Sequence, residues 1–186
     1  GGTYQIDSAD DSIHSNANIT IADGTYTLAT GDDGVHADDA LIVNGGTITV
    51  TESYEGLEGL AVTINDGTID ITASDDGINT AGEKMELNGG YIHILAGGDG
   101  VDSNGDLTIN GGEIYIDGPS DNGNSAIDYG DRSSAYVNGG TLVAIGSSGM
   151  AEVMSDSSKQ KVLMVKLGEQ MEAGNVVLTD SEGNVI

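Results

Sequence analysis

The chain has 186 residues and a formal net charge of −26, because 31 Asp and Glu face only 5 Lys and Arg. Such an acidic chain excludes nucleic acid and anionic membranes as partners and favours cations, and no apolar run approaches the roughly 18–20 residues of a membrane span. The absence of Cys excludes disulfides, and the lack of Phe and Trp leaves a core of Ile, Val, Leu and Ala, which suits β-structure.

Glycine marks a repeat of about 22 residues along most of the chain. The equivalent glycines of successive repeats are Gly2, Gly24, Gly46, Gly67, Gly90, Gly112 and Gly140. Within the repeat, segments such as residues 25–28 and 40–43 alternate with a period of two, which predicts strands with one buried face. Three short strands and three turns per repeat are typical of one rung of a parallel β-helix. We expect an all-β, right-handed parallel β-helix of about 6–7 rungs over residues 1–152, since parallel crossovers are overwhelmingly right-handed.

The repeat ends near Val153. Residues 161–167 are predicted to form a strand, and residues 175–178 and 185–186 a hairpin around a turn at 180–183. A solenoid needs its ends covered, so we expect residues 153–186 to be a separate unit that caps the core with this β-hairpin. The first rung begins at the N-terminus of the chain, which makes that end a candidate surface for a homo-oligomer or for attachment.

One column of turns carries asparagine, at Asn44, Asn65, Asn88, Asn110 and Asn138. Gly and Asn supply the positive φ that tight turns require. Stacked Asn side chains can also hydrogen-bond along the helix axis. We therefore predict a structural role for this column and no binding role.

Acidic residues recur around one apolar position per rung. Stacking places equivalent residues of neighbouring rungs about 4.8 Å apart. Three columns result: Asp11, Asp33, Glu55, Asp76 and Asp99; the preceding Asp10, Asp32 and Asp75; and, after the apolar residue, His14, His36, Glu58, Asn79, Asp102 and Asp128. Like charges at this spacing repel each other, so either the carboxyl pKa values rise or a cation neutralises the columns.

Calcium fits these columns, because Ca²⁺ takes 6–8 oxygen ligands at about 2.3–2.6 Å and tolerates irregular geometry. We predict that the protein binds Ca²⁺ through Asp10, Asp11, Asp32, Asp33, Glu55, Glu58, Asp75, Asp76, Asp99, Asp102 and Asp128. Mg²⁺ is less suitable because its geometry is stricter, and three His without Cys disfavour zinc. Two alternatives remain open: a transition-metal site at the stacked His14 and His36, and a merely solvating acidic face. Asp38 and Asp39 lack counterparts in most rungs and are left out of the site.

The repeated unit, as in residues 67–78 followed by Leu87-Asn88-Gly89-Gly90, resembles a family of secreted bacterial carbohydrate-binding domains. The resemblance covers about residues 1–150, and the C-terminal segment also resembles the end of that family. It implies a parallel β-helix similar to that of pectate-type polysaccharide lyases. It also implies bound calcium, and binding of cellulose and of acidic sugars such as polygalacturonate. The Asp-Asp-Gly-apolar motif matches best at Asp32–Val35 and Asp75–Ile78.

The leading hypothesis is a non-catalytic, secreted or cell-surface bacterial protein that binds acidic polysaccharide. An anionic protein needs a bridge to an anionic glycan, and Ca²⁺ shared between Asp and uronate carboxylates provides one. The first alternative is a polysaccharide lyase, which needs a base. Within the rungs only Lys84 and Arg132 are basic, and Lys84 falls on a different turn from the acids. The second alternative is a structural or adhesive module that calcium stabilises.

Overall fold

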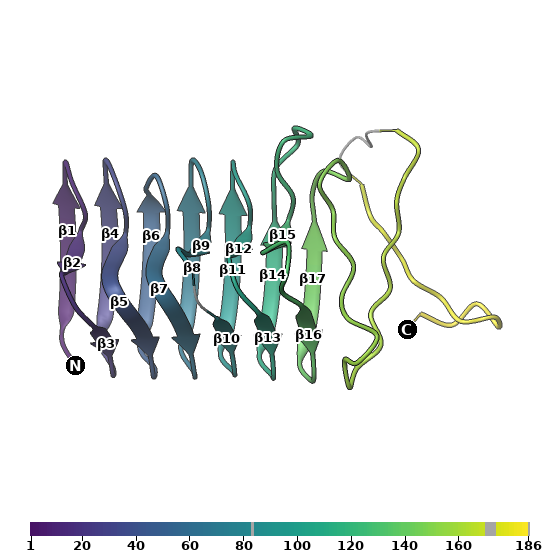
Figure 1. The fold of residues 1–186 in the computed structure, drawn as a ribbon, viewed down its shortest axis with the longest axis horizontal. Coiled ribbons are helices and arrows are strands. Elements are labelled where there is room, and N and C mark those ends of the chain that lie inside the picture. The colour runs from purple at the N-terminus through teal and green to yellow at the C-terminus, as the bar shows by residue number, and fades with distance from the viewer. Residues whose placement is uncertain (83, 170–173, 186) are drawn as a thin grey trace.

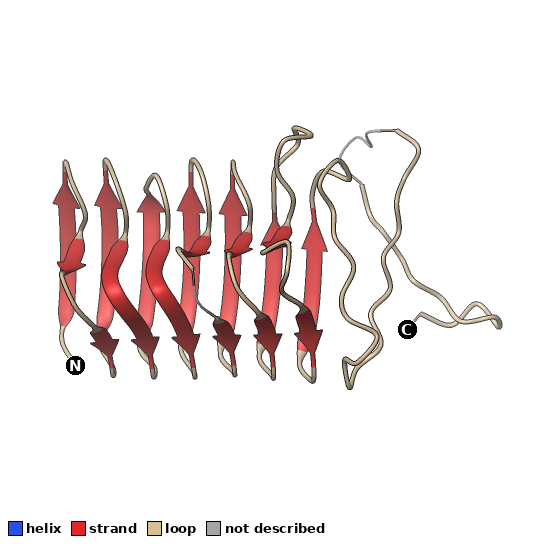
Figure 2. Ribbon diagram, viewed as in Figure 1, coloured by secondary structure: helices blue, strands red, loops and turns tan. Residues whose placement is uncertain are grey.

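The protein is a parallel β-solenoid of about six turns (Figure 1). A computed structural model of the chain describes residues 1–82, 84–169 and 174–185, and none of these residues lies in a helix (Figure 2). One face is a seven-stranded parallel sheet: β1 (Thr3–Ser8), β4 (Thr25–Thr30), β6 (Thr47–Glu52), β8 (Thr68–Ala73), β11 (Tyr91–Ala96), β14 (Glu113–Asp117) and β17 (Thr141–Ile145). The predicted parallel β-helix is therefore confirmed, and its right-handed sense stays a prediction.

The second sheet supplies the other two sides of each turn. Its strands are β2 (Ile13–Ser15), β3 (Ile19–Ile21), β5 (Val35–Val43), β7 (Leu57–Ile64), β9 (Ile78–Thr80), β10 (Met85–Leu87), β12 (Val101–Ser103), β13 (Leu107–Ile109), β15 (Ile127–Tyr129) and β16 (Ala135–Val137). In the second and third turns the two short strands merge into the long strands β5 and β7, each of which pairs with two strands of a neighbouring turn.

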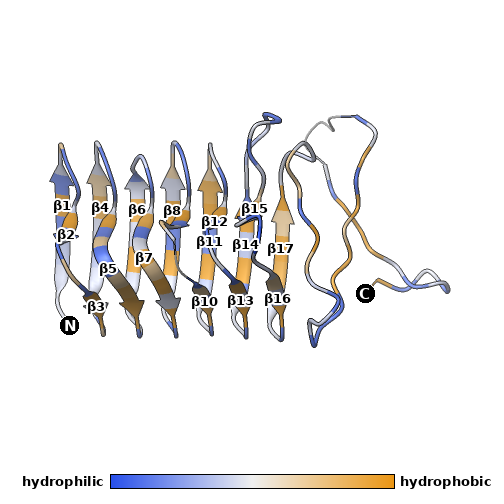
Figure 3. Cartoon of the chain, viewed as in Figure 1, coloured by the Kyte–Doolittle hydropathy of each residue, from blue (hydrophilic) through white to orange (hydrophobic). Residues whose placement is uncertain are grey.

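The core is a stack of aliphatic side chains that point inward from all three sides. Ile48, Ile69, Ile92 and Ile114 are successive registered partners on the first sheet, and all are fully buried. A single turn could not bury its inner face alone, so stacking of turns provides the stability. Figure 3 shows the resulting alternation of apolar and polar positions along the strands.

The repeated glycines and asparagines hold the turns between the strands. The seven glycines that define the repeat all have positive φ, between 86° and 155°, a conformation that costs glycine little. Asparagine does not share this role, since no described residue other than glycine has positive φ. The predicted Asn ladder is confirmed: each Nδ2 donates to the preceding Oδ1 at 2.8–2.9 Å through Asn44, Asn65, Asn88, Asn110 and Asn138.

The C-terminal segment differs from the prediction. Residues 161–167 form no strand, and the predicted hairpin is reduced to one antiparallel bridge between Thr179 and Val185 around a turn at Asp180; Ile186 lies outside the described residues. Alternating apolar residues are not sufficient to form a strand here, because the segment has no neighbouring strand to pair with and its apolar side chains are largely exposed. Residues 153–160 do lie along the last turn, where the Ser155 and Gln160 amides donate to Ala135 and Val137 carbonyls. A separate capping unit over residues 153–186 stays a prediction.

Candidate functional site

One continuous row of polar side chains follows the second sheet along the solenoid. The strands β2, β5, β7, β9, β12 and β15 pair in parallel. The residues that follow the inward apolar position of each strand are registered partners of one another: His14, His36, Glu58, Asn79, Asp102 and Asp128. With the columns that precede it, of Asp10, Asp11, Asp32, Asp33, Glu55, Asp75, Asp76 and Asp99, we call this row the acidic ladder. The predicted stacking of the third column is therefore confirmed.

The inner carboxylates of the ladder have a structural role that the sequence did not reveal. In four of them, Oδ1 accepts a hydrogen bond from a backbone N–H of the next turn: Asp33 N to Asp11 (3.1 Å), Glu55 N to Asp33 (3.2 Å), Asp99 N to Asp76 (2.7 Å) and Ser125 N to Asp99 (2.5 Å). Such charge-assisted bonds fix the side-chain rotamer. The backbone of the next turn thus holds one oxygen of each carboxylate, while the second oxygen of Asp11 lies 2.7 Å from His14 Nδ1.

A glycine follows Asp33, Glu55, Asp76 and Asp99, because the chain there packs closely against both the core and the next turn. A Cβ atom on Gly77 would overlap the Ile94 side chain and the Gly100 carbonyl oxygen. Gly34, Gly56 and Gly100 are equally confined. The Asp-Asp-Gly-apolar motif therefore has a packing cause: the glycine brings the acid close to the solenoid, and the apolar residue enters the core.

The crowding of carboxylates changes their acidity. Burial, followed by the charges of neighbouring acids, raises the pKa of Asp76 to about 7 and that of Asp102 to about 6. Burial likewise raises the pKa of Glu55 and of Glu58 to about 7. The pKa values of Asp33 and Asp99 are also raised, mainly by burial. Loss of water and repulsion both disfavour the anions, so either protonation or a bound cation would stabilise these carboxyls.

Four groups of ligand atoms lie close enough together to hold a metal ion, with all atoms of a group within 4.8 Å of one another. They are Asp76–Asp99–Asp102, Asp10–Asp11–Asp32, Asp11–His14–His36 and Asp33–His36–Glu58. Most of the acids predicted to bind calcium thus come together in such groups. Among the described residues, Glu55, Asp75 and Asp128 belong to none of them.

Asn79 carries a further oxygen in the same turn as Asp76. It is the registered partner of Asp102, and its Nδ2 donates to Glu55 Oε2 at 3.0 Å. Its Oδ1 is buried and accepts no hydrogen bond from any described residue. A buried acceptor without a partner is costly, and an amide oxygen is a suitable ligand for a hard cation. The three carboxylates of Asp76, Asp99 and Asp102 are likewise oxygen donors, the ligand type of a hard cation.

Two further acids lie near the ladder at positions that have no equivalent in the other repeats. Glu152 lies outside the repeats, yet its Oε2 is buried without a hydrogen-bond partner among the described residues, and burial and the Asp128 charge raise its pKa. Asp38, which the sequence analysis left out, lies in an irregularity of β5 where the register shifts, with Oδ1 3.7 Å from His36 Nε2. Only the tertiary structure places these two residues.

A second surface lies on the first sheet, away from the ladder. A shallow groove of about 620 Å³ runs across the starts of β8, β11, β14 and β17, where Thr68, Tyr91, Glu113 and Thr141 are successive registered partners. Tyr91 is 42% exposed, and its ring lies 5.8 Å from that of Tyr115. The groove therefore offers an aromatic face, hydroxyl groups and a carboxylate along the solenoid axis.

The fold and the ladder together define a parallel β-solenoid with clusters of metal-ligand side chains. A family model described as carbohydrate-binding domain-containing protein matches residues 1–34 and 32–182. The chain belongs to this family, as its sequence motif suggested. No curated protein and no solved structure matches the chain. Within the part of the chain that the structure describes, no helix is long and apolar enough to cross a membrane.

Proposed function

We propose that this carbohydrate-binding domain binds acidic polysaccharide through Ca²⁺ ions held by the acidic ladder. The observation that carries the proposal is the cluster of Asp76, Asp99 and Asp102, in a ladder that also contains the buried, unpartnered Asn79 Oδ1. Raised carboxyl pKa values and a buried acceptor indicate oxygens that lack a positive partner. Ca²⁺ supplies that partner, and its coordination number leaves positions for ligands from outside the protein.

A polyuronate is the glycan that such a site suits best. The protein carries a net charge of −26, so an anionic glycan would be repelled without cations. Ions bound along the ladder would meet the carboxylates of successive sugars, and a straight row of turns matches a linear polymer. This ligand also favours a secreted or cell-surface location, where such polymers are found.

We expect polygalacturonate to bind in calcium and to be released by a chelator. The double variant Asp76→Asn/Asp102→Asn should weaken binding about tenfold or more, because the amide side chains keep the shape but lose the charge that holds Ca²⁺. Isothermal titration of polygalacturonate at fixed calcium measures this effect. Asp7→Asn is the matched control, since Asp7 is an exposed acid on β1, outside the ladder. Equal affinity of wild type and double variant would contradict the proposal.

The same titrations distinguish the alternatives. A chelator that lowers the melting temperature while no glycan binds would indicate a calcium-stabilised structural module. Release of unsaturated uronides would indicate a lyase. Lys84 is a poor base for that reaction, because its Nζ lies 2.7 Å from Glu86 Oε2. The adjacent strand β10 pairs with Val62–Ile64 and Leu107–Ile109, whereas Asp102 pairs with Asn79 and Asp128 on another side of the turn.

A second candidate ligand, cellulose, is favoured by the groove across β8, β11, β14 and β17. Aromatic rings bind the apolar faces of neutral sugars, and the exposed Tyr91 is placed for this contact. Tyr91→Ala should lower retention on cellulose several-fold and leave calcium-dependent polygalacturonate binding unchanged. Tyr54→Ala is the control, since Tyr54 is 49% exposed and is not among the residues lining the groove. Equal losses in both variants would contradict a site in the groove.

A further inference from the structure

The two ends of the acidic ladder offer different ligand atoms. Toward the C-terminal end the third column provides only oxygen and amide groups, at Asn79, Asp102 and Asp128. In the first two turns it provides two imidazoles, His14 and His36, which are registered partners with ring centroids 4.9 Å apart. Imidazole suits zinc and its neighbours in the transition series, whereas Ca²⁺ prefers oxygen.

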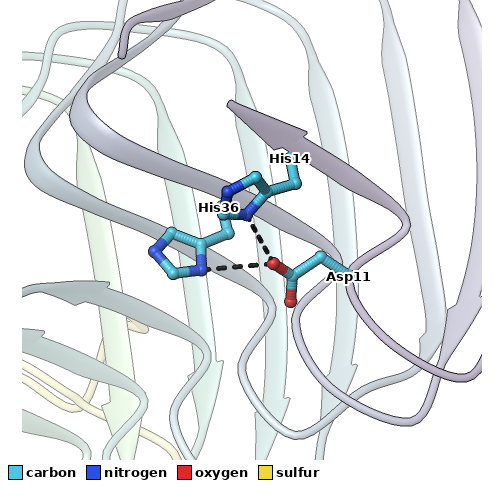
Figure 4. Close-up of side chains that lie close together, drawn as sticks. All are labelled: Asp11, His14 and His36. Carbon is cyan, nitrogen blue, oxygen red and sulfur yellow. Dashed lines mark hydrogen bonds and ion pairs between the residues drawn. The ribbon is translucent and has the colours of Figure 1, made fainter. Parts of the chain in front are cut away.

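Both imidazoles converge on a single carboxylate oxygen (Figure 4). Asp11 Oδ2 lies 2.7 Å from Nδ1 of His14 and 3.3 Å from Nδ1 of His36. The other oxygen of Asp11 accepts the Asp33 amide at 3.1 Å, so the backbone of the next turn orients this carboxylate. Two ring nitrogens and one oriented carboxylate oxygen are the ligand types of a three-ligand zinc site.

More carboxylates surround His36 than one N–H can satisfy. Asp33 Oδ2 and Glu58 Oε2 each lie 3.4 Å from the same His36 Nδ1, in addition to Asp11 Oδ2 at 3.3 Å. The side chains of Asp33 and Asp11 are only 8% and 10% exposed. One Nδ1–H can donate along only one direction. Three carboxylate oxygens around this nitrogen therefore indicate that a cation, and not a single proton, would neutralise them.

We propose that Asp11, His14 and His36 bind a divalent transition-metal ion of the zinc class, with Asp33 and Glu58 completing its surroundings. This site lies at the N-terminal end of the ladder and is separate from the calcium site at Asp76, Asp99 and Asp102. Ligands about 2.0 Å from a tetrahedral ion lie about 3.3 Å apart, which matches the separation of Asp11 Oδ2 and His36 Nδ1. His14 needs to withdraw from Asp11 by about 0.6 Å to admit the ion.

The bound ion would join the first three turns of the solenoid. Asp11 and His14 belong to the first turn, Asp33 and His36 to the second, and Glu58 to the third. The His14 and His36 side chains are 40% and 27% exposed, so the ion would keep a face toward solvent. It therefore strengthens this end of the ladder and leaves a coordination position for water or for an external ligand.

Titration of the metal-free protein with Zn²⁺ tests the site, and Co²⁺ reports its geometry through visible absorption. We expect His14→Gln/His36→Gln to weaken Zn²⁺ binding at least tenfold and to abolish the tetrahedral Co²⁺ spectrum, with calcium binding at Asp76, Asp99 and Asp102 unchanged. His93→Gln is the matched control, because His93 Nδ1 lies 2.9 Å from the single carboxylate of Asp70 on the first sheet. The variant Asp76→Asn/Asp102→Asn should lose calcium affinity and keep zinc affinity.

Unchanged Zn²⁺ affinity in the double histidine variant would overturn the zinc site. So would an octahedral Co²⁺ spectrum that the double variant shares with the wild type. Neither result would affect the calcium site at Asp76, and a failure of the calcium proposal would leave the zinc result standing.

Discussion

In the presence of a chelator, the melting temperature of the protein should fall by roughly 5–10 °C between pH 5 and pH 8. The reason is the raised pKa of the ladder carboxyls, about 7 for Glu55, Glu58 and Asp76 and about 6 for Asp102. The folded protein holds these protons more tightly than the unfolded chain does. The resulting stabilisation is complete below the ordinary values of about 3.8 to 4.5 and is lost as the pH rises through 6 to 7.

The size of this effect follows from the shifts after allowance for solvent. One pKa unit corresponds to about 1.4 kcal/mol, and screening of partly exposed groups reduces this figure considerably. A net loss of about 2–3 kcal/mol lowers the melting temperature of a chain of this size by roughly 5–10 °C. Calcium should reverse the loss at pH 8, because the ion replaces the protons.

Thermal unfolding followed by circular dichroism at several pH values, with chelator and with calcium, measures both effects. Asp76→Asn supplies the control, since an amide cannot ionise at this position and the decline between pH 5 and 8 should become shallower. A melting temperature that rises with pH in chelator would show that repulsion within the ladder does not limit stability.

The second large effect is expected at the glycines that follow the ladder acids. Gly77→Ala should destabilise the fold by about 1–3 kcal/mol, because the added methyl group meets the Ile94 side chain and the Gly100 carbonyl with no space to relax. Urea denaturation measures the free energy of unfolding. Gly82→Ala is the control, since the nearest atom to its added methyl group would be Leu60 Cδ1 at 3.7 Å.

The comparison between these two glycines separates packing from chain entropy. Both substitutions reduce the freedom of the unfolded chain in the same way, so any difference arises from contacts in the folded protein. If Gly77→Ala and Gly82→Ala have equal stability, the close approach of successive turns does not account for the motif.

The periodic part of the structure could be predicted from the sequence because each turn buries the same apolar positions and needs glycine at the same place. Ile48, Ile69 and Ile92 share a column because each begins the inward face of an equivalent strand, and the spacing of glycines fixes that register. The third column of the ladder follows from the same spacing. Stacking is thus a consequence of the period alone.

Side-chain rotamers, and residues without equivalents in other repeats, could not be predicted from the period. Spacing places Asp11 below Asp33 but does not show that the Asp33 amide binds one of its oxygens, because that bond depends on the rotamer. Glu152 comes from outside the repeats, and Asp38 occupies an irregularity, so neither has equivalents to compare. Residues 161–167 alternate like a strand and remain unpaired, since alternation reports an apolar face and not the presence of a partner strand.

The four hydrogen bonds from a backbone N–H to a carboxylate of the previous turn have a consequence for how such a protein changes in length. A turn that is added or removed as a whole carries its own donor and its own acceptor, so the bonds close again across the junction. The number of carboxylate clusters can therefore change in steps of one turn while the spacing between clusters stays constant. A partial turn would leave a backbone N–H and a carboxylate out of register, and the row of carboxylates would be interrupted there.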